Sequence, residues 1–480
     1  MKPNRTLKIA GGLMAALMIL NTAVRADEGS QASNPKLMSM VDNLSKQMAA
    51  MQRTIDAQNS KIRDLQNRPA AGGGAAAEPT PPMSDYEFGQ RLDASLGGAQ
   101  KWLKDLSFKG DVRLRYEAFN YKSGNPAETD DRNRFRIRLR FGWEKKFSED
   151  LKVGFGLASG DSVGTNGVNT DPASTNATLT NDFNFKNIWI EKVYASYTPS
   201  FLKFGPLQKV NFTAGKFDNP FEKGSTDMVW DRDIKPEGIY EKADFKLLDT
   251  ENFDLDSYLT MGQLILQEQS AIGKDSELFA YQLGLNAAAY VPFMERPLQW
   301  LGAVSLYQYH NYGEYSNFTI AGTSRANGNT NADGDATSLD NSAFSIWEFY
   351  NEMTVTPFGL PIRPFVDVAI NQAAVDPFTD RNKAWSLGSK MGGINKKGDW
   401  ELGYQYKWIE ADSVVGNFSD SDFGPGYNDH RGSVFKATYA LADSVTIGAA
   451  AFLVNNLSKG TGSVVDEETR RFQVDLIYKF

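Results

Sequence analysis

Hydrophobic and polar residues alternate strictly in many short segments of this chain. Residues 134–143 read RFRIRLRFGW, with arginine at every second position and apolar side chains at the positions between. Successive side chains of a β-strand point to opposite faces. The segment is therefore predicted to be a strand with one apolar face and one cationic face. A sheet buried in a soluble protein cannot expose such a face on every strand, so the pattern favours a barrel with lipid outside and water inside.

The same alternation predicts sixteen antiparallel strands. Two of them, 297–310 and 343–357, carry bulky residues on both faces, so fourteen or eighteen strands also fit the pattern. The predicted strands are 107–118, 132–146, 150–160, 186–198, 207–217, 236–247, 251–267, 277–292, 297–310, 343–357, 361–371, 382–396, 398–412, 430–442, 444–456 and 468–480.

The connections between these strands alternate in length. Those after even-numbered strands are mostly tight, as at 359–361 and 396–399, whereas those after odd-numbered strands are long and polar, as at 161–185, 311–342 and 413–429. Short turns at one rim and long loops at the other are typical of transmembrane β-barrels. We therefore predict an all-β, transmembrane antiparallel β-barrel over 107–480. A soluble sandwich or solenoid would explain the alternation but not the asymmetry of the connections.

The last strand shows the alternation in its most informative form. It ends RFQVDLIYKF, which resembles the sorting signal of bacterial outer-membrane barrels, in which the final residue is Phe and alternate positions are apolar. The resemblance implies a barrel assembly machinery as a partner and outer-membrane lipid as the surroundings. The residues of this predicted assembly signal are Phe472, Val474, Leu476, Tyr478 and Phe480.

The N-terminus is typical of an exported protein. Lys2, Arg5 and Lys8 precede an apolar run from Ile9 to Leu20, and a small residue, Ala26, offers a cleavage site. Residues 1–26 are therefore predicted to be a signal peptide. An uncleaved anchor is the alternative, but twelve apolar residues fall short of the roughly 20 needed to span a membrane.

Between the signal peptide and the barrel the pattern changes from period two to heptads. Residues 35–68 are predicted to form a coiled coil, and Gln58 occupies one of its core positions. Residues 69–83 are rich in Gly, Ala and Pro and are predicted to be a flexible linker. A short amphipathic helix is expected over 84–106. The apolar heptad positions are Leu37, Val41, Leu44, Met48, Met51, Ile55, Ile62 and Leu65.

Composition narrows the chemistry. The chain has no cysteine, so disulfides and thiol chemistry are excluded. Removing the signal peptide takes four of the 51 basic residues and leaves 47 against 59 acidic ones, a formal net charge of −12. This acidity argues against nucleic acid as a partner. We expect no metal, no cofactor and no catalytic residue.

One connection points to a family. A strand ending in Gly215 and Lys216 is followed by Asn219-Pro220-Phe221, then by WDRD at 230–233 and by PEG at 236–238. With the layout of coiled coil, linker and barrel over 35–480, this segment resembles the putative porin family of Gram-negative outer membranes and is more distantly similar to phosphate-selective porins. The resemblance implies an outer-membrane porin for passive diffusion of ions and small hydrophilic solutes. It also implies that the third long connection folds inward as a constriction loop, and that the chain forms a homotrimer.

The charged residues fit such a pore. A sixteen-stranded barrel is wide enough for an aqueous channel, and opposed rows of charge in it would order water and polar solutes. The predicted basic wall comprises Arg113, Arg115, Arg134, Arg136, Arg138 and Arg140, and the predicted constriction loop carries Asp227, Asp231, Asp233 and Glu237.

Three other interpretations of the sequence stay open. The arginines could instead form structural ion pairs with Asp111, Glu117, Asp475 and acidic residues of the loops, which would only neutralise the lumen. The coiled coil could make the barrel a tether in the periplasm that contacts peptidoglycan or a protein partner. A barrel enzyme would use His310 or His430, although no Ser or Asp with triad spacing accompanies either of them.

Overall fold

The computed structural model describes most of the chain from residue 105 onward. The predicted signal peptide, coiled coil and linker lie outside the described residues, as does the predicted helix at 84–106 except for its last two residues, of which Leu106 already begins a strand. The described ranges are 105–122, 131–161, 173–180, 182–268, 275–291, 294, 296–312, 319–320, 323–324, 329, 343–374, 379–424, 428–457 and 468–480.

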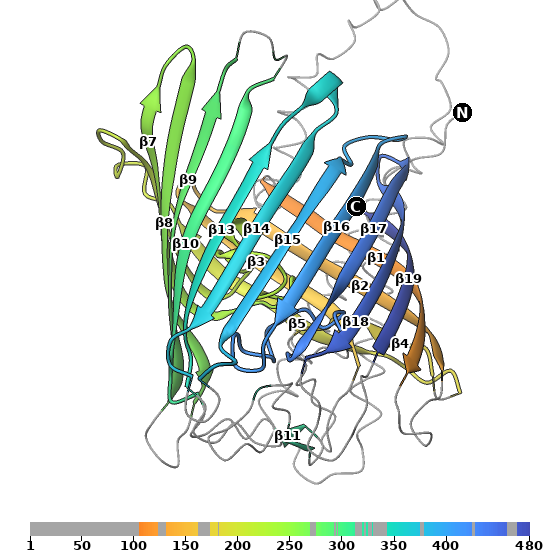
Figure 1. Ribbon diagram of the computed structural model, residues 1–480. Coiled ribbons are helices and arrows are strands. Elements are labelled where there is room, and N and C mark those ends of the chain that lie inside the picture. The colour runs from red at the N-terminus through yellow and green to blue at the C-terminus, as the bar shows by residue number, and fades with distance from the viewer. Residues whose placement is uncertain are drawn as a thin grey trace, which may run out of the picture. The chain divides into compact units, whose positions relative to one another are not determined.

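Sixteen long antiparallel strands close into a barrel, which confirms the predicted fold class and strand number (Figure 1). β1 extends four residues beyond its predicted end at 118. The barrel strands are β1 (Leu106–Lys122), β2 (Arg132–Lys146), β3 (Leu151–Gly160), β5 (Asn187–Tyr197), β6 (Leu207–Lys216), β7 (Glu237–Asp249), β8 (Phe253–Gln267), β9 (Ser276–Ala289), β10 (Leu298–His310), β13 (Ser345–Thr354), β14 (Ile362–Asn371), β15 (Lys383–Gly392), β16 (Trp400–Ile409), β17 (His430–Ala442), β18 (Val445–Asn456) and β19 (Glu468–Lys479).

The remaining elements are short and lie in the connections. β4 (Ala177–Thr178) adds to β2 from the connection between β3 and β5, and β11 (Thr319–Ile320) pairs only with β12 (Thr323–Ser324). Two 3-10 turns, η1 (Glu222–Gly224) and η2 (Pro357–Gly359), complete the set. None of the helical segments in the described ranges has the length and apolar character needed to cross a membrane.

The barrel closes where the first strand meets the last. β1 pairs with β19 along its length, with Asp111 opposite Lys479. Gly110 and Phe480 then exchange two backbone hydrogen bonds, of 2.9 and 3.1 Å. A Cβ atom on Gly110 would lie 2.6 Å from Cζ of the Phe480 ring, so this position requires glycine. The terminal aromatic side chain therefore packs on the seam of the barrel.

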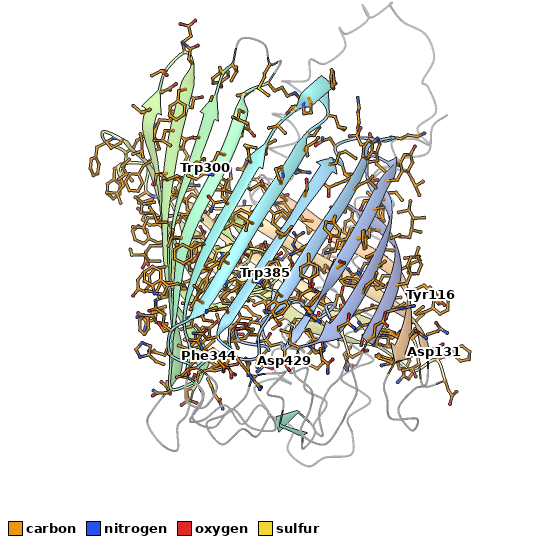
Figure 2. All side chains as sticks on the ribbon, viewed as in Figure 1. Tyr116, Asp131, Trp300, Phe344, Trp385 and Asp429 are labelled. Carbon is orange, nitrogen blue, oxygen red and sulfur yellow. The ribbon has the colours of Figure 1, made fainter. Side chains whose placement is uncertain are left out.

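The alternation places apolar side chains outside and polar side chains inside. On β2, Phe135 is 61% exposed and Leu139 40%, whereas Arg136 is only 8% exposed. Figure 2 shows side chains covering the outer surface, among them Tyr116, Trp300 and Trp385. This outward apolar surface suits lipid, because a strand with one lipid face and one lumen face alternates in this way.

The described residues of two connections fold into the barrel and add many apolar side chains to its core. The connection at 217–236, between β6 and β7, is called loop A here, and residues 410–424 after β16 are called loop B. Phe221 and Met228 of loop A and Val414 of loop B are fully buried. Since a barrel of this size has room beyond the side chains of its own strands, the apolar residues of these loops fill part of the interior.

Candidate functional site

The arginines of β1 and β2 lie inside the barrel on adjacent strands. The register places Arg115 opposite Arg136 and Arg113 opposite Arg138. Like charges at such spacing repel one another unless anions lie between them. The structure supplies these anions from β1, from β19 and from both inward loops.

Glu117 is the centre of the largest ion-pair network. Its carboxylate is fully buried on β1, contacts Arg134 of β2, and lies 2.6 Å from Arg471 of β19 and 3.3 Å from Arg115. Arg115 also forms a bidentate ion pair with Asp475, donating from Nε and Nη2 to the two carboxylate oxygens at 2.7 Å each. These pairs join the three strands at the closing seam. They are the structural ion pairs that the sequence offered as an alternative role for the arginine row.

Asp233 of loop A is the predicted loop acid that meets the arginine row. Its Oδ1 lies 2.6 Å from Arg140 and 3.9 Å from Arg138. Thr175, from the connection between β3 and β5, donates its backbone N–H to the other oxygen at 3.3 Å. Opposite charges therefore face each other between a wall strand and an inward loop.

The other three predicted loop acids have different partners. Asp231 accepts backbone N–H groups from Asp233 and Ser421, both at 2.8 Å. Glu237 begins β7 and pairs with Lys216 at 2.7 Å.

Asp227 contacts a different part of the wall, β16 and β17, rather than the arginine row. Its Oδ1 is 2.8 Å from the ammonium group of Lys407, which is fully buried on β16, and its Oδ2 is 3.5 Å from that of Lys436. Lys407 also binds Asp420 of loop B at 2.6 Å. One lysine thus ties both inward loops to the wall.

The sequence predicts a long, polar outer loop at 413–429, yet residues 411–420 are all buried. Loop B binds loop A through its backbone: Asp231 donates its N–H to the carbonyl of Phe418 at 2.7 Å, and Asp420 donates to the carbonyl of Asp227 at 3.0 Å. The ring of Phe418 stacks on Trp230 at 5.6 Å between centroids. The apolar run at 414–415 and the later aromatics Phe418 and Phe423 were the only signal in the sequence.

Loop B also reaches the arginine row. Asp422 lies 2.9 Å from Arg115 and 2.6 Å from Arg471. Neither Asp422 nor Lys407 was among the predicted site residues. Arg471 was visible as the polar face of the last strand, but its link to Glu117 depends on the barrel closing.

Loop A is attached to the opposite wall by two buried carboxylates. Glu348 of β13 accepts a hydrogen bond from the hydroxyl of Ser225 at 2.6 Å. Asp367 of β14 accepts from both the hydroxyl of Thr226, at 2.6 Å, and its backbone N–H, at 3.1 Å. The first half of loop A is therefore held by specific polar contacts as well as by its apolar side chains.

The two neighbouring acids of loop A differ in their pKa. Burial raises the pKa of Asp233, but the positive charges of Arg140 and Arg138 outweigh burial and lower it below its ordinary value. Burial also raises the pKa of Asp231, and the negative charges of Asp233 and Asp420 raise it further. Asp233 therefore stays ionised to lower pH than Asp231.

The fold and the apolar outer surface define a class of protein, a transmembrane β-barrel, here with a charged interior. The family model described as putative porin matches residues 126–358 and 333–480. The chain belongs to the putative porin family, which confirms the resemblance found in the sequence. This family and the barrel fold place it in the outer membrane of a Gram-negative bacterium.

Solved structures of similar fold are porins with low sequence identity. OprB of Pseudomonas putida at high pH is 11% identical and gives a TM-score of 0.47 over 81% of this chain and 97% of that chain. OmpF of Salmonella typhi in complex with daunomycin is 11% identical, with a TM-score of 0.43 over 78% and 97%. A variant of the Rh. blastica porin is 10% identical, with a TM-score of 0.38 over 78% and 100%. No curated protein matches the sequence.

Proposed function

We propose that the chain is a diffusion channel for ions and small hydrophilic solutes, and that loops A and B form its constriction. The observation that carries the proposal is the contact of Asp233, on an inward loop, with Arg140 and Arg138 on the wall. Fixed opposite charges across a narrow passage favour water and polar solutes over apolar ones. The arginine row and the loop acids then serve as pore-lining and constriction groups as well as ion pairs.

The direct test is electrical. Purified protein added to a planar lipid bilayer should give discrete conductance steps. A barrel that inserts but gives no steps would contradict the channel and would favour the structural alternative, in which the barrel tethers envelope layers through its N-terminal segment.

Charge changes at the constriction should alter the ion preference of the channel. We expect Arg136→Ser with Arg138→Ser to shift the reversal potential toward cations, and Asp233→Asn to shift it toward anions, because each change removes one sign of fixed charge. Asp231→Asn should shift it less than Asp233→Asn, since the pKa of Asp231 is raised and its carboxyl keeps its proton to higher pH. The reversal potential under a salt gradient, compared with that of the wild type, measures the shift in each of the three variants. Equal values in every variant would assign these groups a purely structural role.

The last strand is proposed to be the assembly signal, read by the barrel assembly machinery. Phe472, Leu476, Tyr478 and Phe480 are all exposed on the outer surface, where such a partner has access to them. Deleting Phe480 should reduce the amount of barrel in the outer membrane, because it removes both the signal and the contact with Gly110. Phe358→Ala is the matched control, since Phe358 is an exposed aromatic in a turn. Normal amounts of heat-resistant barrel after the deletion would contradict this role.

The N-terminal segment is proposed to be a periplasmic coiled coil that supports a homotrimer and contacts peptidoglycan or a periplasmic protein. The heptad pattern over 35–68 supports the coil. Sedimentation of the 35–68 peptide tests this proposal, and a monomer at high concentration would count against it.

We favour a channel over a barrel enzyme. The two candidate histidines have local structural contacts: the ring of His310 lies edge-on to Phe279 at 5.2 Å, and Nδ1 of His430 lies 2.7 Å from the carbonyl of Asn428.

A further inference from the structure

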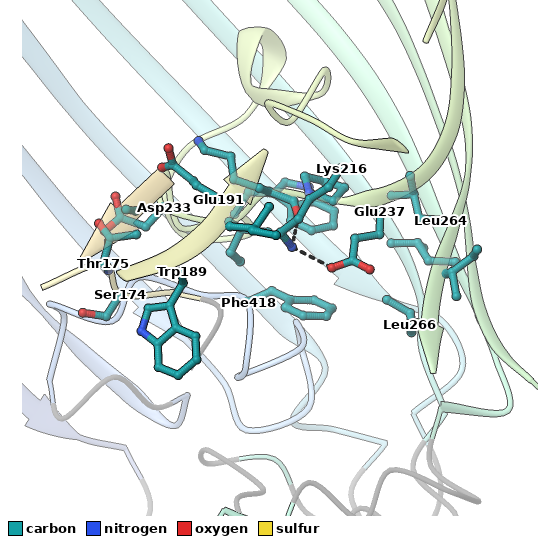
Figure 3. A pocket seen from close by; sticks show the side chains of 18 of the residues that line it. Ser174, Thr175, Trp189, Glu191, Lys216, Asp233, Glu237, Leu264, Leu266 and Phe418 are labelled. Carbon is teal, nitrogen blue, oxygen red and sulfur yellow. Dashed lines mark hydrogen bonds and ion pairs between the residues drawn. The ribbon is translucent and has the colours of Figure 1, made fainter. Parts of the chain in front are cut away.

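Two cavities lie on either side of the second half of loop A. The larger, of about 550 Å³, opens among Ser159, Trp189, Leu264 and Phe418 (Figure 3). The smaller, of about 270 Å³, opens among residues that include Arg140, Trp143 and Lys479. Among the residues that the structure describes, Glu191 of β5 and Lys235 of loop A line both cavities.

The cavities lie in opposite halves of the barrel. The smaller one is lined by the beginning of β1, at Gly110, and by the end of β19, at Lys479, which meet at the rim that carries the short turns. The larger one is lined by the last residues of β8, at 264–266, and by Trp189 near the start of β5, which belong to the rim that carries the long connections. Glu191 and Lys235 therefore lie between the larger cavity, on the side of the long connections and called the outer cavity here, and the smaller cavity, on the side of the short turns and called the inner cavity.

A β-bulge places Glu191 at this point. Gly156 of β3 pairs with Lys192 and the next residue, Leu157, pairs with Ile190, so Glu191 is an extra residue on β5. A bulge redirects a side chain that strict alternation would place on the other face. Glu191 and its neighbour Lys192 both line the inner cavity as a result.

Side chains separate the two cavities here. The Glu191 carboxylate lies 2.9 Å from Nε of Arg140, although the groups are not oriented for a hydrogen bond. The ammonium group of Lys235 lies 3.2 Å from a carboxylate oxygen of Asp218, whose side chain is 57% exposed. The same ammonium group donates to the carbonyl of Arg232 at 3.2 Å, and the Lys235 side chain is 10% exposed. Lysine is a long and flexible side chain, so rotation of Lys235 away from these two partners would open this side of the barrier.

The middle of loop A packs more closely against the barrel wall and loop B. Thr226 binds Asp367 through its backbone as well as its hydroxyl, and the Asp231 N–H is bound to the carbonyl of Phe418 in loop B. A third cavity on that side, lined by Lys390, holds only about 120 Å³. Loop A thus leaves more space beside the wall formed by β2, β3 and β5 than beside Lys390.

We infer that the permeation path crosses the constriction between Glu191 and Lys235, and that these two side chains contribute to its selectivity. This inference rests on the proposed channel function. A carboxylate on the wall and an ammonium group on the loop would act on each solute in a passage too narrow for full hydration. Neither residue was among the predicted site residues.

The absence of cysteine from the whole sequence allows a site-specific test. Glu191→Cys and Lys235→Cys are made in the full chain and treated in the bilayer with a bulky, charged thiosulfonate reagent. Modification at either position should lower single-channel conductance by roughly half or more, because it fills the narrowest part of a pore. Lys390→Cys is the matched control. Position 390 is also occupied by a lysine inside the barrel, but it lines the third cavity, of about 120 Å³, which lies off the proposed path. Its modification should change conductance little.

The outcomes separate this inference from the proposed function. A wild-type barrel without conductance overturns both. If the wild type conducts but modification of the 191 and 235 cysteine variants leaves their conductance unchanged, the path alone is overturned. The same holds if modification of the 390 variant lowers conductance as strongly as modification at 191 or 235. If a cysteine variant does not fold, Glu191→Gln and Lys235→Gln replace it. They should shift the reversal potential toward anions and toward cations respectively, and unshifted potentials overturn the path.

Discussion

Replacing Glu117 by Gln should destabilise the barrel by roughly 3–5 kcal/mol, the range expected when one partner is removed from a buried ion-pair network. The Glu117 side chain is fully buried and balances Arg134, Arg471 and Arg115 across the closing seam. Glutamine keeps the shape of the side chain but removes the charge. The arginines would then repel one another in a place where water reaches them poorly.

The measurement is unfolding of the refolded barrel in urea, followed by tryptophan fluorescence. Glu237→Gln is the matched control because it is the same substitution in an ion pair whose carboxylate side chain is 59% exposed. Exposed pairs contribute about 0–1 kcal/mol, so this variant should unfold close to the wild-type midpoint. Equal midpoints for the two variants would show that water in the lumen solvates the arginines around Glu117.

Replacing Lys407 by Met should release both inward loops from the wall of β16. The buried ammonium group binds Asp227 of loop A and Asp420 of loop B, and its removal leaves two carboxylates without their cation. The cost should again be about 3–5 kcal/mol. This free-energy cost is avoided if the loops move so that the two carboxylates reach water. Such movement would widen the passage and make it fluctuate, so we expect a larger and noisier single-channel conductance.

The control for this prediction is Lys436→Met. The ammonium group of Lys436 lies 3.5 Å from the same carboxylate, but its side chain is 49% exposed, so conductance should stay near the wild-type value. An unchanged conductance in Lys407→Met would show that backbone contacts between the loops suffice to hold them.

The lysine contact also predicts a dependence on pH. Burial raises the pKa of Asp227, but the charges of Lys407 and Lys436 outweigh burial and lower it below its ordinary value. A carboxyl with a lowered pKa in the folded state contributes stability above the pKa of the unfolded chain. That contribution is lost as the pH falls through the folded value. The wild-type loops should therefore stay closed at neutral pH and loosen only in strong acid.

The strands of this protein were predictable because their signal is local. In RFRIRLRFGW the pleat of the backbone sends every second side chain to the same face, whatever else the chain does. The observed exposure of Phe135 and burial of Arg136 follow this rule. The sixteen strands were found for the same reason. β1 was predicted too short because nothing in its own residues marks where pairing with β19 ends.

The interior depended on contacts between distant parts of the chain. Lys407 was seen as one polar residue among others on its strand, and its role comes from Asp227, which is 180 positions away. Glu191 points inward through a bulge that only the pairing with β3 reveals. Of the predicted loop acids, Asp233 contacts the arginine row, whereas Asp227 contacts Lys407 on β16.

By itself, the sequence determined the faces of the strands and the family of the protein, and it favoured sixteen strands; closure of the barrel decided that number against fourteen or eighteen. The tertiary structure decided which connections enter the barrel. Loop B is similar to the other long connections in length and polarity, and it is buried because Lys407, Arg115 and Arg471 offer partners to its acids while loop A offers Trp230 to its Phe418. A loop folds inward when the lumen satisfies its charges and its backbone better than water does. That condition exists only after distant strands have closed into a barrel.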